Sequence, residues 1–450
     1  MKLPPRIERV LRAAGFFVTP RAALLLAAGA PVVALLRGSA ATWTALAWSV
    51  AWVAAVASDV VRAKMPTRLS WSRGLPPKLS IGVANPVALT IGNPFSTPVT
   101  LRGRETPPPV FAGERAFGPV TVPPHADVTV PLSFTPPARG LFAFGSIGVR
   151  TTGPLGLGGR AVRVPLPQEA KVYPDIVAVR SYALLARKGA LAEMGIKRMR
   201  LAGEGTEFES LREYLEGDSF RDIDWKATAR HGKPIVRSFE VERSQTLVIA
   251  IDAGRLMTPR VGALAKLDRA VNAALMLAYL GTERDDMVGL LVFGRDVERY
   301  LPPRKGHRQF LAILEALYAV EGKVEEPDYD RALRYLATKL PKRALVAVFT
   351  DLQGKEPSHR LLATLSAMAP RHLPLVITQR NREVERTARR DPTREPQVFE
   401  AAVAESLLAD KTAALRLLQA RGVLVLDVLP EELTVASVNR YLEIKARGRL

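Results

Sequence analysis

Two carboxylates stand just after apolar runs typical of buried strands, in positions where side chains can do chemistry. Asp252 follows the run 246–251, and Asp351 follows the run 344–349 and Thr350. In an open parallel sheet, ligands bind at the carboxyl ends of the strands, near the point where the strand order reverses. We therefore expect Asp252 and Asp351 to lie together at the ligand-binding edge of such a sheet.

A carboxylate with a histidine can also serve hydrolysis, and the residues available for this are Asp218, Asp224 or Asp351 with His231. The sequence has no G-x-S-x-G elbow, no H-E-x-x-H run and no cysteine nucleophile. It also lacks the G-x-x-x-x-G-K-[ST] loop, which excludes a P-loop ATPase. We therefore expect a protein that is not an enzyme, and a hydrolase using paired carboxylates is the alternative.

The densest run of charged and aromatic residues is 207–243, where nine acidic and seven basic side chains are interleaved with large apolar ones. The near balance of charge argues against a nucleic-acid surface. Apolar spacing in 208–215 predicts a helix ending near Gly217, and Ser219 with Asp222 predicts the capping box of a second short helix. The expected ion-pair lattice either packs the fold or contacts a partner, and its members are Glu207, Arg212, Tyr214, Asp218, Arg221, Asp224, Trp225 and Arg230.

The stretch from Gly205 to Arg230 fills every fixed position of the pattern G-x-E-F-x-x-L-R-x-Y-x-x-G-D-x-x-R-x-I-D-W-x-A-x-A-R. It resembles the bacterial family catalogued as domain of unknown function 58, in which this run leads into a von Willebrand factor A-like domain. An apolar hairpin, a strand-rich segment and an alternating strand-helix half also follow in the usual order of that family. The resemblance implies a von Willebrand factor A-like carboxyl-terminal domain.

The resemblance also implies a metal site, because related domains hold a divalent cation with an Asp-x-Ser-x-Ser run and a later aspartate. Asp252 and Asp351 match those aspartates, and such oxygen ligands suit magnesium or manganese. Gly254 and Leu256 stand where the two serines would be, and Arg255 adds a positive charge. Three arrangements stay open: a bound divalent cation, a metal-free site neutralised by Arg255 or a similar base, and carboxylates that only cap helices.

Members of the resembling family often occur with a MoxR-type AAA+ ATPase. The resemblance therefore implies an adaptor or assembly factor that works with such a motor, which is an inference by analogy. The residues themselves indicate only a fold that commonly binds partners, and they show no complete set of catalytic residues. We expect a protein partner of this kind and no required cofactor.

Two apolar stretches near the amino terminus, 22–36 and 40–57, contain no charged residue. They predict a transmembrane hairpin within residues 1–65, with helices at about 16–36 and 40–57, because flanking arginines and residues 16–18 can lengthen the first span. Basic residues cluster outside both helices, so both termini and the soluble domains are expected in the cytoplasm, at the inner or plasma membrane. A cleaved signal peptide followed by one anchor and a buried soluble hairpin are the alternatives.

The rest of the chain divides into three parts. Residues 66–175 show period-two runs between proline and glycine turns, which predicts an immunoglobulin-like β-sandwich. Residues 176–245 hold the charged signature region, and residues 246–450 predict an α/β doubly wound domain with a parallel sheet. Its strands are expected at 246–251, 287–293, 344–349, 373–377 and 423–428, and its helices at about 262–280, 307–319, 328–340, 358–368, 404–420 and 430–446.

Two further segments are expected to be loops. The glycine-rich run 153–159 is followed by a strand pattern and not by a helix, so it does not fit a phosphate-binding loop. The segment 380–394 carries six arginines and three acidic residues, which is typical of a solvated insertion or of a contact with lipid headgroups or an acidic partner.

The formal net charge is +20, and the basic residues are scattered along the chain. Many of them flank the apolar stretches, which favours attraction to membrane lipid over nucleic acid as the reason for the charge. The absence of cysteine excludes disulfides and thiolate metal sites. We expect membrane lipid and a protein as partners, and no nucleic acid.

Overall fold

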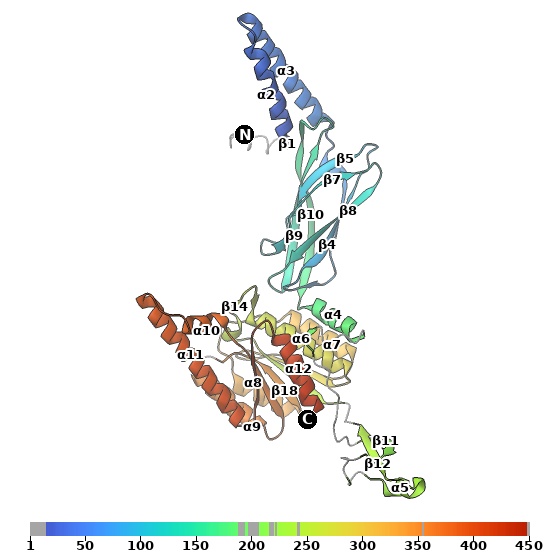
Figure 1. Ribbon diagram of the computed structural model, residues 1–450, viewed down its shortest axis with the longest axis vertical. Coiled ribbons are helices and arrows are strands. Elements are labelled where there is room, and N and C mark those ends of the chain that lie inside the picture. The colour runs from blue at the N-terminus through green and yellow to red at the C-terminus, as the bar shows by residue number, and fades with distance from the viewer. Residues whose placement is uncertain are drawn as a thin grey trace. The chain divides into compact units, whose positions relative to one another are not determined.

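The computed structural model (Figure 1) describes residues 15–187, 194–196, 207–215, 220, 223–240, 244–352 and 355–447. The chain divides into two compact units, Met1–Val172 and Tyr173–Leu450.

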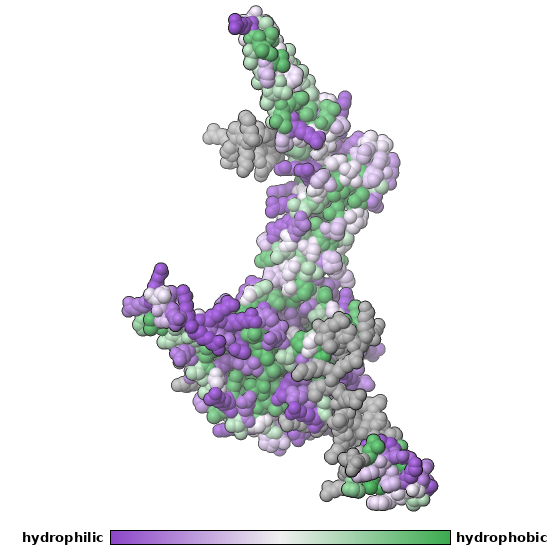
Figure 2. All heavy atoms as spheres, in the orientation of Figure 1, coloured by the Kyte–Doolittle hydropathy of each residue, from purple (hydrophilic) through white to green (hydrophobic). Residues whose placement is uncertain are grey.

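The amino-terminal unit begins with two helices, α2 (Pro20–Ala34) and α3 (Ser39–Arg62), which pack against each other. The indole N–H of Trp52 donates to the Ala22 carbonyl at 2.7 Å, and that of Trp48 donates to the Leu26 carbonyl at 3.3 Å. A Cβ at Gly29 would lie 2.2 Å from the Trp48 indole nitrogen, so only glycine admits this contact. Apolar residues cover the outer surface of both helices (Figure 2).

The predicted start of the first helix is wrong. Phe16–Val18 forms strand β1, which pairs antiparallel with residues 158–160 of β10 (Gly158–Tyr173) instead of adding a helical turn. Helix α2 therefore has 15 residues, fewer than the predicted 16–36. Within the described residues, Ser39–Arg68 is the one helical stretch with the length and apolar composition to cross a membrane.

The second part of this unit consists of two antiparallel sheets. One has the order β1-β10-β9-β5-β7, with β3 also paired to β10, and the other has the order β2-β4-β8-β6. Phe134 of β8 packs edge-on against Phe144 of β9 with ring centroids 6.0 Å apart, so the sheets face each other across an apolar layer. The remaining bounds are β2 Ser70–Gly74, β3 Leu79–Ser80, β4 Asn85–Gly92, β5 Val99–Arg104, β6 Ala112–Gly113, β7 Ala116–Val122, β8 Asp127–Thr135, β9 Gly140–Thr152 and the 3-10 turn Pro66–Arg68.

Asp59, near the carboxyl end of α3, joins the helices to the sheets. Its side chain is fully buried, and its carboxylate accepts backbone N–H groups from Leu155 at 2.7 Å, Leu157 at 2.7 Å and Gly158 at 2.9 Å. Leu155 and Leu157 lie in the loop between β9 and β10, as predicted for the glycine-rich segment, whereas Gly158 is the first residue of β10. A Cβ at Gly153 would lie 2.4 Å from the Asp59 carboxylate, so the loop needs glycine to approach it.

The carboxyl-terminal unit contains a six-stranded sheet in the order β17-β16-β13-β18-β19-β20. Five strands are parallel, and β17 is antiparallel to β16 at one edge. One apolar core lies between the sheet and α4, α6, α7 and α12, and a second lies between the opposite face and α8, α9 and α11 (Figure 1). The strands are therefore buried on both faces, which explains their uninterrupted apolar runs.

The five strands predicted in this unit are confirmed, with shifts of one or two residues at their ends, and all six predicted helices are present. The bounds are α4 Ile176–Arg187, β13 Thr246–Asp252, β14 Arg260–Val261, β15 Leu264–Ala265, α6 Lys266–Glu283, β16 Met287–Phe293, β17 Val297–Arg304, α7 His307–Tyr318, α8 Tyr329–Lys339, β18 Leu345–Phe349, α9 Lys355–Met368, β19 Leu373–Gln379, α10 Arg382–Ala388, α11 Glu395–Ala420, β20 Leu424–Val428, α12 Leu433–Ala446 and the 3-10 turn Arg255–Met257.

Three predictions for this unit are wrong in part. The sheet is not wholly parallel, because β17 pairs antiparallel with β16 at one edge. The prolines and charged residues of β17 hid its strand pattern in the sequence. The charged segment 380–394 is not only a loop, because Asn381 caps helix α10 by accepting the Glu383 N–H at 3.0 Å. Helix α11 begins at Glu395, nine residues before the predicted start at 404.

The predicted helix over 208–215 is also wrong, because Glu207–Glu213 forms strand β11, antiparallel to β12 (Ile235–Glu240). A bulge between Phe208 and Ser210 adds one residue to β11. Because of this extra residue, Phe208 and Leu211 are three positions apart although they pair with residues only two positions apart on β12. The spacing of three indicated the period of a helix. The predicted capping box of Ser219 and Asp222 lies outside the described residues, and the short helix found here is α5 (Trp225–His231), capped by Asp224.

Helix α12 is fixed to the sheet by the buried carboxylate of Asp286. This carboxylate accepts the Gln245 backbone N–H at 2.9 Å and the Lys445 ammonium at 2.5 Å, and the Tyr441 hydroxyl also donates to it. Burial lowers the pKa of Lys445, against the opposing effect of Asp286, and burial raises the pKa of Tyr441 well above its usual value.

We predict that Asp59→Ala destabilises the amino-terminal unit. Removal of the buried carboxylate leaves three backbone N–H groups without their acceptor, of which that of Gly158 is buried, and this should cost about 3 kcal/mol of unfolding free energy. Thermal unfolding of the full chain in a neutral detergent measures this, with Glu114→Ala as a control at an exposed carboxylate. Equal unfolding temperatures for the two variants would contradict the role given to Asp59.

Candidate functional site

Asp252 and Asp351 lie at the carboxyl edge of the sheet, where the strand order reverses. Asp252 ends β13, and Asp351 follows β18, its immediate neighbour. From β13 the sheet continues through β16 on one side and through β18 on the other. This is the switch point at which open α/β sheets bind their ligands, so the predicted placement of the two carboxylates is observed.

The carboxylate of Asp252 is enclosed by hydrogen-bond donors of its own chain. One oxygen accepts the Gly254 backbone N–H at 2.7 Å, and the other accepts the hydroxyls of Thr350 at 2.6 Å and Tyr329 at 3.0 Å. Burial raises the pKa of Asp252, whereas these hydrogen bonds act in the opposite direction. Burial and the charge of Asp252 raise the pKa of Tyr329 well above its usual value, which keeps the phenol protonated as a donor.

Asp351 forms a buried ion pair with Lys266, the first residue of α6. The side chain of Lys266 is 2% exposed and that of Asp351 is 3% exposed. The other oxygen of Asp351 accepts the Leu352 backbone N–H at 2.9 Å and lies 3.6 Å from the Lys411 ammonium. The ammonium groups of two lysines, one from α6 and one from α11, therefore lie beside Asp351.

The residues at this edge do not fit a divalent cation. Both oxygens of Asp252 and both oxygens of Asp351 have donors from the chain, and Gly254 and Leu256 offer no side-chain oxygen. Among the described residues, no three His, Cys, Asp or Glu side chains are arranged to hold a metal ion. The positive charge comes from Lys266, whereas Arg255 forms an ion pair with Glu326 instead.

A cavity of about 240 Å³ opens beside these carboxylates, between the ends of β18, β19 and β20 and the helices α10 and α11. Its polar lining includes Arg380, Arg389 and Lys411, and the Lys411 ammonium lies 2.9 Å from Asp427. Gln379 is buried, and its side-chain oxygen has no hydrogen-bond partner within the described part of the chain. Asp351, Glu385 and Asp427 also line the cavity, and Arg380 is paired with Glu385 at 2.8 Å, so the cavity is polar and carries charges of both signs.

The expected ion-pair lattice is only partly described. Asp218 and Arg221 lie outside the described residues, as does the side chain of Glu207. Arg212 is exposed and donates to the Glu213 carbonyl at 3.3 Å, and the ring of Tyr214 stacks on Phe220 with centroids 5.6 Å apart.

The other members of that predicted set lie on or next to α5. Asp224 caps this helix by accepting the Ala227 N–H at 2.9 Å, whereas Trp225 is 69% exposed and Arg230 is also exposed. His231 is the last of the seven residues of α5, so it lies at the opposite end of this helix from Asp224, which caps its start. The described contacts give Asp224 a capping role and Asp351 an ion pair, and neither contact involves His231.

Sequence reasoning did not select Lys266, Tyr329 or Lys411, although they complete the site. Lys266 and Lys411 fall inside segments predicted as helices, where a lysine normally faces solvent. No signal in the sequence marked Lys266, because the helix was predicted from about residue 262 and this placed the lysine in its second turn. The observed helix begins at Lys266, where the helix dipole disfavours a cation and the carboxylate of Asp351 offsets that effect.

The comparisons with known proteins agree with part of this picture. Residues 210–394 match the family described as "Protein of unknown function DUF58". An uncharacterized protein of Mycobacterium tuberculosis strain H37Rv is 25% identical over 179 residues, and a protein of Mycobacterium bovis matches equally well. The alignment covers 39% of this chain and 56% of the relative, so it spans little more than half of the relative's length.

The comparison with solved structures found, among others, the conserved hypothetical protein BatB from Bacteroides thetaiotaomicron. The two proteins are 15% identical, and the superposition covers 45% of this chain and 98% of that one, with a TM-score of 0.30.

We predict that Lys266→Met lowers the stability of the carboxyl-terminal unit by about 3–5 kcal/mol, because it leaves Asp351 buried without its main partner. The double variant Lys266→Met with Asp351→Leu should recover most of this loss, since it removes both charges. Calorimetric unfolding of the full chain in detergent measures the effect, with the exposed Lys305→Met as the control. An equally large loss in the double variant would show that packing, and not the charge pair, accounts for the result.

Proposed function

We propose that this chain is a membrane-anchored protein-binding module, whose α/β unit is von Willebrand factor A-like and uses a lysine of its own in place of a divalent cation. The observation that carries the proposal is the enclosure of Asp252 and Asp351 by donors of the same chain. Neither carboxylate has a free oxygen for acid-base or nucleophilic work. A neutralised, preformed edge of this kind supports binding in preference to catalysis.

The partner we propose is a MoxR-type AAA+ ATPase, on the basis of the resemblance noted for residues 205–230. The surface proposed for this contact lies beside the 240 Å³ cavity. On α11, Phe399 is 67% exposed and Val403 is 60% exposed, and both line a shallow hollow shared with α10. Exposed apolar side chains with a polar rim, here Glu383 and Glu400, are typical of protein-protein contacts.

We propose that α2 and α3 form a two-pass anchor, and that an immunoglobulin-like sandwich follows it. Support comes from the packing of the two helices and from their outer apolar surface, on which Leu24 is 71% exposed and Trp43 is 70% exposed. In water this surface would be costly, whereas lipid accommodates it. Arginines outside both helices favour a cytoplasmic location for both ends of the chain.

We predict that Phe399→Asp reduces recovery of the ATPase partner after cross-linking in membranes by roughly tenfold or more, because loss of a central apolar anchor costs about 2 kcal/mol. The matched control is Leu311→Asp, a residue that is 42% exposed on α7, the helix that packs on the other face of the sheet through its neighbours Phe310 and Ile313. Quantitative mass spectrometry of the cross-linked material gives the readout. Unchanged recovery with Phe399→Asp, or equal loss with both variants, would reject this docking surface.

We also predict that a reporter fused after Leu450 is active in the cytoplasm, because an even number of spans returns the chain to its starting side. Paired reporters that are active only inside or only outside the membrane measure this. Activity restricted to the outer side would exclude the two-pass arrangement and favour a single anchor.

A further inference from the structure

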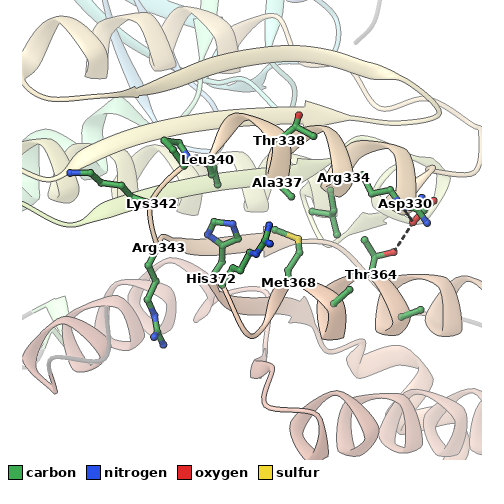
Figure 3. Close-up of a pocket in the computed structure, with 15 residues that line it drawn as sticks. Asp330, Arg334, Ala337, Thr338, Leu340, Lys342, Arg343, Thr364, Met368 and His372 are labelled. Carbon is green, nitrogen blue, oxygen red and sulfur yellow. Dashed lines mark hydrogen bonds and ion pairs between the residues drawn. The ribbon is translucent and has the colours of Figure 1, made fainter.

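A larger cavity lies at the opposite edge of the sheet, where β18 and β19 begin. It is a groove of about 840 Å³ between α8 and α9, closed at one end by the segments that precede these strands. Figure 3 shows His372 beside Met368 in the middle of the groove, with Lys342 and Arg343 at one end and Asp330 and Thr364 at the other. No part of the site described above contributes to this groove.

The hollow arises from small side chains on the facing helices. Ala337 on α8 and Ala363 and Ala367 on α9 line the groove where larger residues would fill it. Met368 and Leu340 add apolar surface. A volume of several hundred cubic ångströms with one apolar wall suits a small organic molecule.

The charged residues of the groove are mainly basic. Arg334 pairs with Asp330 at 2.7 Å, and Asp330 also accepts the Thr364 hydroxyl at 3.4 Å. Three further cations, Lys342, Arg343 and Arg371, line the groove, and no acidic side chain of the described residues forms an ion pair with them. Like charges gathered around a cavity repel one another unless an anion lies between them.

His372 provides an independent sign that a ligand is expected here. The residue is 3% exposed, and within the described chain its Nδ1 atom has no hydrogen-bond partner. Burial lowers the pKa of His372, and the charges of Arg371 and Arg343 lower it further, so the imidazole is neutral at pH 7. Buried polar atoms are normally paired, and an unpaired one in a cavity wall points to a missing partner.

We propose that this groove binds an organic phosphate, with the phosphate near Arg343, Arg371 and the imidazole of His372, and the organic part against Met368 and the alanines. Phosphate suits this site because guanidinium groups bind it through paired hydrogen bonds and a neutral imidazole adds another donor. The phosphate belongs either to a free phosphomonoester or to the headgroup of an anionic phospholipid. The proposal does not depend on the function proposed for the other edge of the sheet.

The test is calorimetric titration of the full chain in neutral detergent with adenosine monophosphate, and in parallel with inorganic phosphate. We expect measurable binding of the nucleotide, weakened at least about tenfold by Arg343→Gln combined with Arg371→Gln, because both guanidinium contacts are lost. His372→Gln, which keeps a hydrogen-bond donor, should weaken binding less than His372→Phe. The control is Arg360→Gln, an exposed arginine on α9 outside the groove, which should leave the affinity unchanged.

A second arm distinguishes the source of the phosphate. Micelles containing phosphatidic acid are compared with micelles containing phosphatidylcholine, and the unfolding temperature is measured. A rise with phosphatidic acid alone, lost in the double arginine variant, identifies a lipid headgroup as the ligand. The proposal is overturned if no phosphate compound binds in either arm, or if Arg360→Gln weakens binding as much as the double variant.

Discussion

The buried ion pair between Lys266 and Asp351 determines what the carboxyl edge of the sheet can do. Taking both charges out of water is costly, and each is tolerated only because the other is present. The lysine ammonium is part of the chain, so the positive charge beside Asp351 does not depend on a bound ion.

The sheet has a second buried lysine-aspartate pair at its other edge, where Lys445 of α12 meets Asp286. The two pairs tie α6 and α12 to opposite ends of the strands, and both helices belong to the same apolar core. The opposite face carries the groove with His372, where Arg334 pairs with Asp330 and three further cations, Lys342, Arg343 and Arg371, form no ion pair within the described residues. Buried charge is thus paired within the chain at one face, whereas the other face carries an excess of exposed cations.

Much of the α/β unit could be predicted from the sequence, because strands buried on both faces must be apolar throughout and their ends then place Asp252 and Asp351. The partner of Asp351 could not be predicted, because 85 residues separate it from Lys266 and only the packing of α6 brings them together. The strand β11 was mistaken for a helix because a single bulge changes the period of its apolar residues. Strand β17 was missed because an edge strand tolerates prolines and charges that a central strand excludes.

The contact of Asp59 with the loop between β9 and β10 has a consequence for biosynthesis. The carboxylate and its first backbone donor are 96 residues apart, so a nascent chain emerges with Asp59 long before that loop leaves the ribosome. Until then, the end of α3 carries a solvated charge and has to stay in contact with water. Docking of the folded β-sheets would bury the Asp59 carboxylate and complete the amino-terminal unit. The two apolar helices would therefore reach their final packing only after the β-sheets that follow them have been synthesised.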